Sequence, residues 1–218
     1  MIRRDPVTLK KVLKVYFICG TPNVSRPLTE ILEEAVQGGA TIFQFREKGE
    51  KALTGEKKKE QAAKLQAICH EKGIPFIIND DVELAVELNA DGVHVGQDDT
   101  SAREVRAKIG PDKILGVSAH SLTEAVQAEK DGADYIGVGP VFATSSKDDA
   151  EEVCGPERIS EFREEGLTLP IVAIGGITFE NTPAVIRAGA DGISVISAIA
   201  SSASPADAAN KLYRKASS

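Results

Sequence analysis

The chain has 218 residues, of which 42% are hydrophobic and 27% charged, and its net charge is −7 at pH 7. This composition is typical of one globular domain and argues against intrinsic disorder. An acidic chain is a poor general nucleic-acid binder, and no segment is apolar enough to span a bilayer. Because three scattered cysteines exclude a disulfide framework, we expect a cytoplasmic protein without nucleic-acid or membrane partners.

Eight short apolar runs rich in β-branched residues recur along the chain, and polar segments with helical spacing separate them. Near-continuous apolar runs are typical of parallel strands that are covered on both faces. We predict strands at residues 15–19, 41–45, 76–79, 92–95, 114–118, 135–138, 171–174 and 192–196.

A short glycine, alanine and aspartate sequence precedes several predicted strands, for example Ala90-Asp91-Gly92, Gly132-Ala133-Asp134 and Gly189-Ala190-Asp191. About eight repeated βα units favour a closed (β/α)8 TIM barrel of the α/β class. The alternative, a doubly wound open sheet, lacks its Gly-x-Gly-x-x-Gly sequence after the first strand. We predict one domain over residues 1–218, with a barrel core at about 15–200 and a C-terminal helix at about 205–215.

Basic side chains follow the second predicted strand. Gln44, Arg46 and Lys48 alternate with apolar and acidic neighbours, so they share one face if the strand continues. Arginine and lysine that converge at the carboxyl end of a barrel strand suit a diphosphate. The alternative is a surface salt-bridge run that includes Glu47.

Paired acids follow the third and fourth predicted strands, in Asn79-Asp80-Asp81 and in Gln97-Asp98-Asp99. Carboxylates at neighbouring strand ends can share one Mg²⁺ with a substrate phosphate. The alternative is helix capping, and both roles fit if Asp81 or Asp98 caps a helix while Asp80 and Asp99 bind metal. His94, inside the fourth predicted strand, is more typical of a hydrogen-bonded barrel residue than of a ligand.

Hydroxyl groups follow the fifth and sixth predicted strands. Ser118 is suited to donate a hydrogen bond to a phosphate or to cap the next helix. Thr144, Ser146 and Lys147 lie in a long polar loop that would clamp an anion if it folded over the site. Serine-rich loops are also common in solvent, which is the alternative.

Small residues follow the last two predicted strands, at Gly175-Gly176 and at Ile196-Ser197. Many barrels bind a phosphate on these two loops and on a short helix N-terminus. The alternative is that the glycines only permit a tight turn. Two anion sites at one barrel mouth predict a transferase with two phosphorylated substrates.

Together these motifs resemble the thiamine phosphate synthase family. The resemblance runs from about Val15 to Ile199. It is carried by Tyr16-Phe17-Ile18, Gln44-Phe45-Arg46-Glu47-Lys48, Asn79-Asp80-Asp81, His94-Val95-Gly96-Gln97-Asp98-Asp99, Gly116-Val117-Ser118, Gly139-Pro140 to Lys147, and Ile174-Gly175-Gly176-Ile177. It implies a barrel enzyme that requires Mg²⁺ and joins 4-amino-2-methyl-5-hydroxymethylpyrimidine diphosphate to 4-methyl-5-(2-phosphoethyl)thiazole, or to its carboxylated form, giving thiamine phosphate and diphosphate.

The resemblance also implies roles for the matching residues. Those implied to contact the pyrimidine diphosphate are Gln44, Arg46, Lys48, Asn79, Ser118 and Lys147. Among them, the predicted catalytic residues are Arg46, Lys48, Ser118 and Lys147. The implied Mg²⁺ ligands are Asp80 and Asp99. The residues implied to hold the thiazole phosphate are Thr144, Ser146, Gly176, Ile196 and Ser197.

The sequence departs from the commonest family pattern at Ser146, where threonine is usual. Serine keeps the hydroxyl, so the departure bears on affinity rather than on the type of reaction. Two other functions stay open: a thiazole tautomerase, which needs neither a diphosphate clamp nor metal carboxylates, and a non-catalytic barrel that binds phosphorylated ligands. The sequence also leaves open a homo-oligomer.

Overall fold

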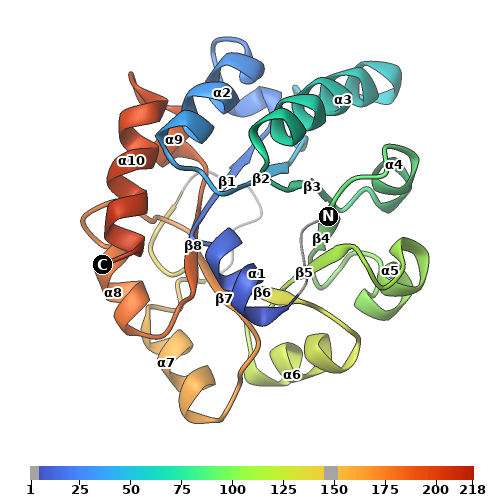
Figure 1. The fold of residues 1–218 in the computed structure, drawn as a ribbon. Helices are drawn as coiled ribbons and strands as arrows, with labels where there is room; N and C mark the ends of the chain where they lie inside the picture. The colour runs from blue at the N-terminus through green and yellow to red at the C-terminus, as the bar shows by residue number, and fades with distance from the viewer. Residues whose placement is uncertain (1–4, 145–151) are drawn as a thin grey trace.

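The chain folds into a closed barrel of eight parallel strands that follow one another in sequence order (Figure 1). The computed structural model describes residues 5–144 and 152–218. The strands are β1 (Val15–Cys19), β2 (Ile42–Phe45), β3 (Phe76–Asn79), β4 (Gly92–Val95), β5 (Ile114–Ser118), β6 (Tyr135–Val138), β7 (Ile171–Ile174) and β8 (Gly192–Val195). The predicted (β/α)8 barrel is therefore confirmed, and the alternative of an open sheet is wrong.

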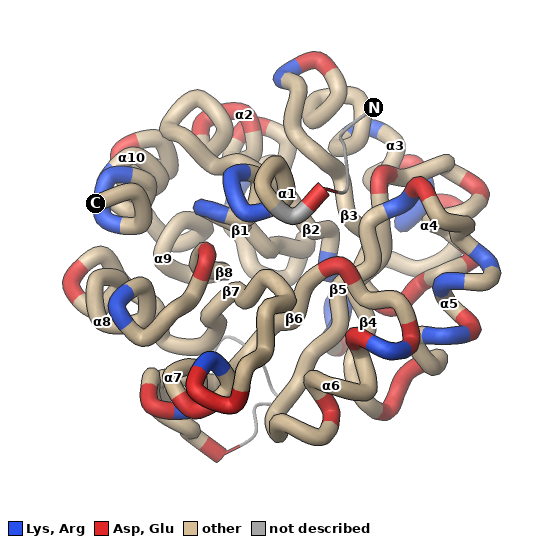
Figure 2. The backbone as a smooth tube through the Cα atoms, turned by 60° about the horizontal axis from the view of Figure 1, so that its bottom comes forward, with Lys and Arg blue, Asp and Glu red and all other residues tan. Residues whose placement is uncertain are grey.

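Helices surround the barrel and bury its outer face. They are α1 (Pro6–Val12), α2 (Leu28–Gly38), α3 (Gly55–Lys72), α4 (Val82–Glu87), α5 (Ala102–Ile109), α6 (Leu122–Lys130), α7 (Glu157–Glu164), α8 (Thr182–Arg187), α9 (Ser197–Ala200) and α10 (Pro205–Ala216), with a 3₁₀ turn, η1 (Thr21–Asn23). Acidic and basic residues are interspersed over α4, α5 and α7 (Figure 2). Among the described helices, none has the length and apolar character needed to cross a membrane.

Helix α1 packs under the amino ends of the strands. Asp5 begins the helix by accepting a hydrogen bond from the backbone N–H of Thr8 at 3.0 Å. Leu9 and Leu13 are buried in a cluster with Tyr16 and other residues that point into the barrel. This cluster fills the interior of the barrel at the amino ends of the strands.

Two arginines clamp the amino ends of the strands with the same pattern of contacts. Arg106 donates to the carbonyl oxygens of Gly110 and Gly132, 4 and 26 residues ahead, and pairs with Asp134 at 2.7 Å. Arg163 of α7 makes the same contacts. It donates to the carbonyl oxygens of Leu167 and Gly189, again 4 and 26 residues ahead, and pairs with Asp191 at 2.7 Å. The recurring aspartate of the sequence is thus a structural residue.

Each aspartate of this repeat also holds a strand in register. The carboxylate of Asp134 accepts the backbone N–H of Leu115 in β5 at 2.8 Å, and that of Asp191 accepts the N–H of Ile171 in β7 at 3.0 Å. The side chain of Asp134 is only 7% exposed. A buried carboxylate with this many partners depends on its arginine, because an unpaired buried charge is costly.

Replacing Arg106 by alanine is therefore expected to lower the free energy of unfolding by about 3 kcal/mol, because it leaves the buried Asp134 carboxylate without its charged partner. The matched control is Arg103→Ala, which removes a side chain that is 78% exposed and paired with Asp131 at 3.2 Å. This control is expected to cost at most about 1 kcal/mol. Chemical denaturation measures both values, and equal losses would contradict a special role for Arg106.

Candidate active site

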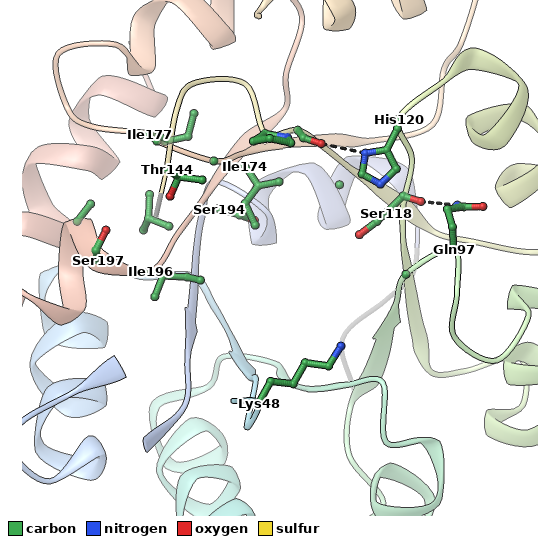
Figure 3. Close-up of a pocket in the computed structure, with 18 of the residues that line it drawn as sticks. Lys48, Gln97, Ser118, His120, Thr144, Ile174, Ile177, Ser194, Ile196 and Ser197 are labelled. Atoms are coloured by element: carbon green, nitrogen blue, oxygen red, sulfur yellow. Dashed lines mark hydrogen bonds between the residues drawn. The ribbon is translucent and has the colours of Figure 1, made fainter. Parts of the chain in front are cut away.

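Two adjoining cavities open at the carboxyl ends of the strands, the usual position of a barrel active site. Their volumes are about 230 Å³ and about 90 Å³. Both are lined by Lys48, Asp99 and Ser118, so the two cavities form one mouth. Lys48 extends into the larger cavity from the β2 side, opposite Ser118 and the β8 loop (Figure 3).

The smaller cavity gathers the polar residues predicted at the ends of β2 to β5. Its lining includes Gln44, Arg46, Lys48, Asn79, Asp80, Asp99 and Ser118. These seven residues come from four different loops or strand ends, and barrel closure brings them together. The arrangement places two basic side chains beside two carboxylates, as a diphosphate and a cation together would require.

Lys48 and Asp80 form an ion pair, with Lys48 Nζ 2.5 Å from Asp80 Oδ2. This oxygen is buried, and Asp99 is the second charged neighbour of the Asp80 carboxylate. The backbone of Asp80 has φ 61°, a left-handed conformation that few non-glycine residues adopt. A strained and buried carboxylate beside a second acid is a candidate cation ligand.

Burial and charge act differently on the two acids. Burial raises the pKa of Asp80; Lys48 opposes this shift, and the neighbouring Asp99 adds to it. Burial acts on Asp99 in the same direction, but hydrogen bonds from Asp80 and from the backbone N–H of Gly96 outweigh it and lower the pKa of Asp99. The Gly96 N–H lies 2.8 Å from Asp99 Oδ2. The two shifts are opposite, so as the pH falls Asp80 takes up a proton before Asp99 does.

These two carboxylates fit a divalent cation only together with other ligands. Across residues 5–144 and 152–218, no cluster of three or more histidine, cysteine or acidic side chains is present. Mg²⁺ commonly takes one or two protein carboxylates and completes its shell with water and substrate phosphates. The donor set and the buried oxygen of Asp80 fit that pattern.

The neighbouring acids have structural roles. Asp81 caps α4 by accepting the N–H of Leu84 at 3.1 Å, and it pairs with Lys58. The cap of α5 is Ser101 rather than Asp98. One acid of the first pair thus starts a helix, which leaves Asp80 for the cavity.

Glu47 is not part of a surface salt-bridge run, so that alternative was wrong. Its side chain is buried and accepts the backbone N–H groups of Thr21 and Leu53, each at 2.8 Å, and the hydroxyl of Thr21. The carboxylate thereby ties the loop after β1 to the loop after β2. We conclude that Glu47 anchors the segment that carries Arg46 and Lys48.

Ser118 lies at the end of β5, and its hydroxyl contacts His94 rather than a helix. His94 Nε2 is 3.1 Å from Ser118 Oγ, and His94 Nδ1 is 3.0 Å from the hydroxyl of Tyr135. The capping role considered for Ser118 is wrong, because Ser121 caps α6. His94 is a hydrogen-bonded barrel residue, as expected from its position in the strand.

The larger cavity is lined by residues from the last loops. Among the predicted phosphate-site residues, Thr144, Gly176, Ile196 and Ser197 line it. Gly175 and Gly176 have φ values of 93° and 62°, and a Cβ on Gly176 would lie 2.5 Å from the carbonyl oxygen of Ala143. Glycine is thus required there by the positive φ and by the close approach of the loop after β6. This agrees with the alternative that the glycines permit a tight turn. Ser146 and Lys147 lie outside the described residues.

Several lining residues were missed by sequence reasoning. Gln97 donates from Nε2 to the carbonyl oxygen of Ser118 at 2.6 Å, and His120 Nδ1 lies 3.0 Å from that of Gly139 (Figure 3). Ser194 of β8 lines both cavities. Gln97 and His120 stand directly in the predicted βα loops, so their position was the available signal. Ser194 lies inside an apolar strand, so its sequence position gave no sign that it lines the site.

The topology and the polar mouth at the carboxyl ends of the strands define a (β/α)8-barrel protein of the kind that carries enzyme active sites. Residues 15–199 match the family described as thiamine monophosphate synthase. The chain belongs to this family.

Individual relatives agree with this assignment over nearly the whole chain. A thiamine-phosphate synthase of Geobacillus thermodenitrificans is 60% identical over 212 residues, with 97% of this chain and 96% of that protein covered. One of Bacillus cereus (strain ZK / E33L) is 56% identical over 217 residues, with coverages of 100% and 99%. The solved structure of thiamine phosphate pyrophosphorylase from Pyrococcus furiosus is 35% identical, with a TM-score of 0.84 and coverages of 96% and 98%.

The opposite pKa shifts predict opposite effects of neutralising the two acids. Because the pKa of Asp80 is raised, its ionisation costs stability as pH rises through that pKa. Because the pKa of Asp99 is lowered, its charge stabilises the fold above its ordinary pKa and stops doing so as pH falls. Asparagine also tolerates the left-handed backbone of residue 80.

At pH 7, Asp80→Asn is expected to raise the midpoint of thermal unfolding, and Asp99→Asn is expected to lower it. The Asp80→Asn difference should shrink as the pH falls to about 4, and the Asp99→Asn difference should shrink only at lower pH, because the folded chain keeps Asp99 ionised below its ordinary pKa. Thermal melts from pH 3 to pH 8 measure this. A higher midpoint for Asp99→Asn than for Asp80→Asn at pH 7 would contradict the charge assignment.

Proposed function

We propose that the chain condenses 4-amino-2-methyl-5-hydroxymethylpyrimidine diphosphate with 4-methyl-5-(2-phosphoethyl)thiazole, or its carboxylated form, in a Mg²⁺-dependent reaction. The products are thiamine phosphate and diphosphate. Family membership over residues 15–199 supports this reaction. The observation that carries it is the Lys48–Asp80 pair beside Asp99. These residues bring a basic group for a diphosphate and two carboxylates for a cation to the same cavity.

In this proposal the diphosphate lies in the smaller cavity. Arg46 and Lys48 neutralise its negative charge, while Gln44 and Asn79 orient the pyrimidine. Asp80 and Asp99 would hold Mg²⁺, which supplies positive charge to the diphosphate as it leaves. Lys48 can exchange its contact with Asp80 for a phosphate oxygen because its side chain is 43% exposed.

The bond changes require little acid–base chemistry from the protein. The bond between the pyrimidine methylene carbon and the diphosphate oxygen breaks, and both electrons leave with the oxygen. The resulting cation is stabilised by the aminopyrimidine ring, and the thiazole nitrogen then forms the new bond with its lone pair. Ser118 would donate a hydrogen bond at this site, with Lys147 on the leaving diphosphate. The chain thus acts as a transferase of a pyrimidinylmethyl group.

The thiazole phosphate would occupy the larger cavity. Its implied contacts are Thr144, Ser146, Gly176, Ile196 and Ser197, of which the described members line that cavity. Because Ser118 and Lys48 line both cavities, two substrates in these positions would meet between them. Holding two rings in this way supplies much of the acceleration of a two-substrate reaction.

Diphosphate release by the purified protein tests the proposal. The assay uses both substrates together and each one alone, with and without Mg²⁺. Release that requires all three, with thiamine phosphate formed in step, supports it. Proton exchange on the thiazole alone would replace it with a tautomerase, and ligand binding without either reaction would replace it with a non-catalytic binding protein.

Replacing the proposed metal ligands tests the metal assignment. Asp80→Ala and Asp99→Ala are each expected to lower turnover on the order of 100-fold or more, because the leaving diphosphate loses its charge partner. Asp112→Ala, an exposed aspartate before β5, serves as the control with turnover unchanged. Unchanged turnover of the first two variants at saturating Mg²⁺ would refute the assignment.

A further inference from the structure

An unbroken chain of hydrogen bonds crosses the barrel interior beneath the cavities. Gln44 Nε2 donates to the hydroxyl of Tyr16 at 2.9 Å, and the hydroxyls of Tyr16 and Tyr135 are 2.8 Å apart. The chain continues from Tyr135 to His94 Nδ1 at 3.0 Å and from His94 Nε2 to Ser118 Oγ at 3.1 Å. Five side chains from five strands are thus connected. The end residues Gln44 and Ser118 line the smaller cavity, as do Tyr16 and His94, whereas Tyr135 is not among its lining residues.

Burial of the two tyrosines and the absence of a side chain at Gly116 allow these hydrogen bonds to form. Tyr16 and Tyr135 are 1% and 0% exposed, so water does not compete for their hydroxyls. Gly116 of β5 lies beside the contact between Tyr135 and His94, where a Cβ would come within 2.3 Å of the Tyr135 hydroxyl and 2.5 Å of His94 Nδ1. The proposed reaction uses none of the three central residues, Tyr16, Tyr135 and His94.

Counting protons gives the chain one direction. Burial raises the pKa of Tyr16 and of Tyr135, so each hydroxyl keeps its proton. Tyr16 accepts from Gln44, and Tyr135 is the partner left for the hydroxyl proton of Tyr16, so we assign donation from Tyr16 to Tyr135 and from Tyr135 to His94 Nδ1. His94 therefore carries its proton on Nε2 and donates to Ser118.

We propose that Tyr16, Tyr135 and His94 are positioning residues that fix the polarity of both ends of the chain. Gln44 presents its carbonyl oxygen to the cavity as an acceptor, and Ser118 presents its hydroxyl as a donor. Neither end can reverse alone: reversal requires an amide flip at Gln44, rotation of both tyrosine hydroxyls and transfer of the His94 proton to Nδ1. The two cavity groups therefore change polarity together or not at all.

This inference rests on the proposed function for its substrate class. An aminopyrimidine offers an amino donor next to ring nitrogens that accept, which matches a fixed acceptor and a fixed donor. The corresponding oxopyrimidine offers the reverse pattern, a carbonyl acceptor next to an N–H donor. A site with fixed polarity rejects such an analogue because its own polar groups are left unpaired. The hydrogen-bonded chain of side chains thus makes the site selective for the amino form of the substrate.

The first test reads the direction of the chain without turnover. ¹⁵N NMR of histidine-labelled protein without substrates reports the tautomer, and the signal lost in His94→Gln identifies His94 among the three histidines. We expect the proton on Nε2, and a mixture of tautomers in Tyr135→Phe, where Nδ1 loses its donor. A proton on Nδ1 in the parent protein would overturn the proposal whether or not the protein is active.

The second test measures selectivity. The ratio of kcat/KM for the aminopyrimidine diphosphate to that for its oxo analogue is expected to fall roughly tenfold in Tyr135→Phe, the effect of one lost hydrogen bond. Tyr16→Phe should give a similar fall, and the double variant should add little, because either change breaks the same chain. Tyr213→Phe, which removes a hydroxyl from a side chain 40% exposed on α10, is the matched control with no change.

The outcomes separate this inference from the proposed function. Equal losses of kcat/KM for both substrates, with the ratio unchanged, would mean that the tyrosines are only structural and would overturn the inference. A parent protein that turns over neither pyrimidine would refute the proposed function, and the NMR experiment would still decide the direction of the chain. Thermal melts of the phenylalanine variants confirm that each one is folded.

Discussion

The pairing of β1 with β8 is the constraint on which the site depends. Tyr16 aligns with Ser194 and Phe17 with Val195, so the first and last strands of the sheet become neighbours. Closure turns eight separate strand ends into one ring, and residues as far apart in sequence as Gln44 and Ser197 then border the same mouth. Without it, the basic residues after β2 and the small residues after β8 would lie at opposite edges of an open sheet.

Inside the barrel, Tyr16, Tyr135 and His94 place polar groups on strands rather than on loops. A buried hydroxyl or imidazole costs free energy unless its hydrogen bonds are satisfied. The interior meets this requirement by linking Tyr16, Tyr135 and His94 to one another, with apolar residues and α1 filling the space below. Side chains that share hydrogen bonds in this way hold one another in place, so Ser118 and Gln44 reach the cavity from a rigid base.

The barrel and most of its site could be predicted from the sequence because both follow local rules. Each strand is a short apolar run, and the polar residues after it lie at the mouth. What the sequence could not predict depends on contacts across the barrel. His94 of β4 meets Tyr135 of β6 across Gly116 of β5, a contact between strands that are not neighbours and that leaves no periodic signal. The inward turn of Glu47 and the packing of α1 under the barrel depend in the same way on distant partners.

Function and stability are divided between the two ends of the same strands. At the carboxyl ends, Asp80 is held in a left-handed conformation with a raised pKa, which costs stability. At the amino ends, Arg106 and Arg163 hold buried aspartates that fix β5 and β7 in place. The strained Asp80 follows β3, and the amino end of that strand is held by Asp91, whose carboxylate accepts the backbone N–H of Phe76 at 2.9 Å. The hydrogen bonds and ion pairs at the amino ends stabilise the fold, and this stability offsets the cost of holding Asp80 in an unfavourable conformation at the mouth.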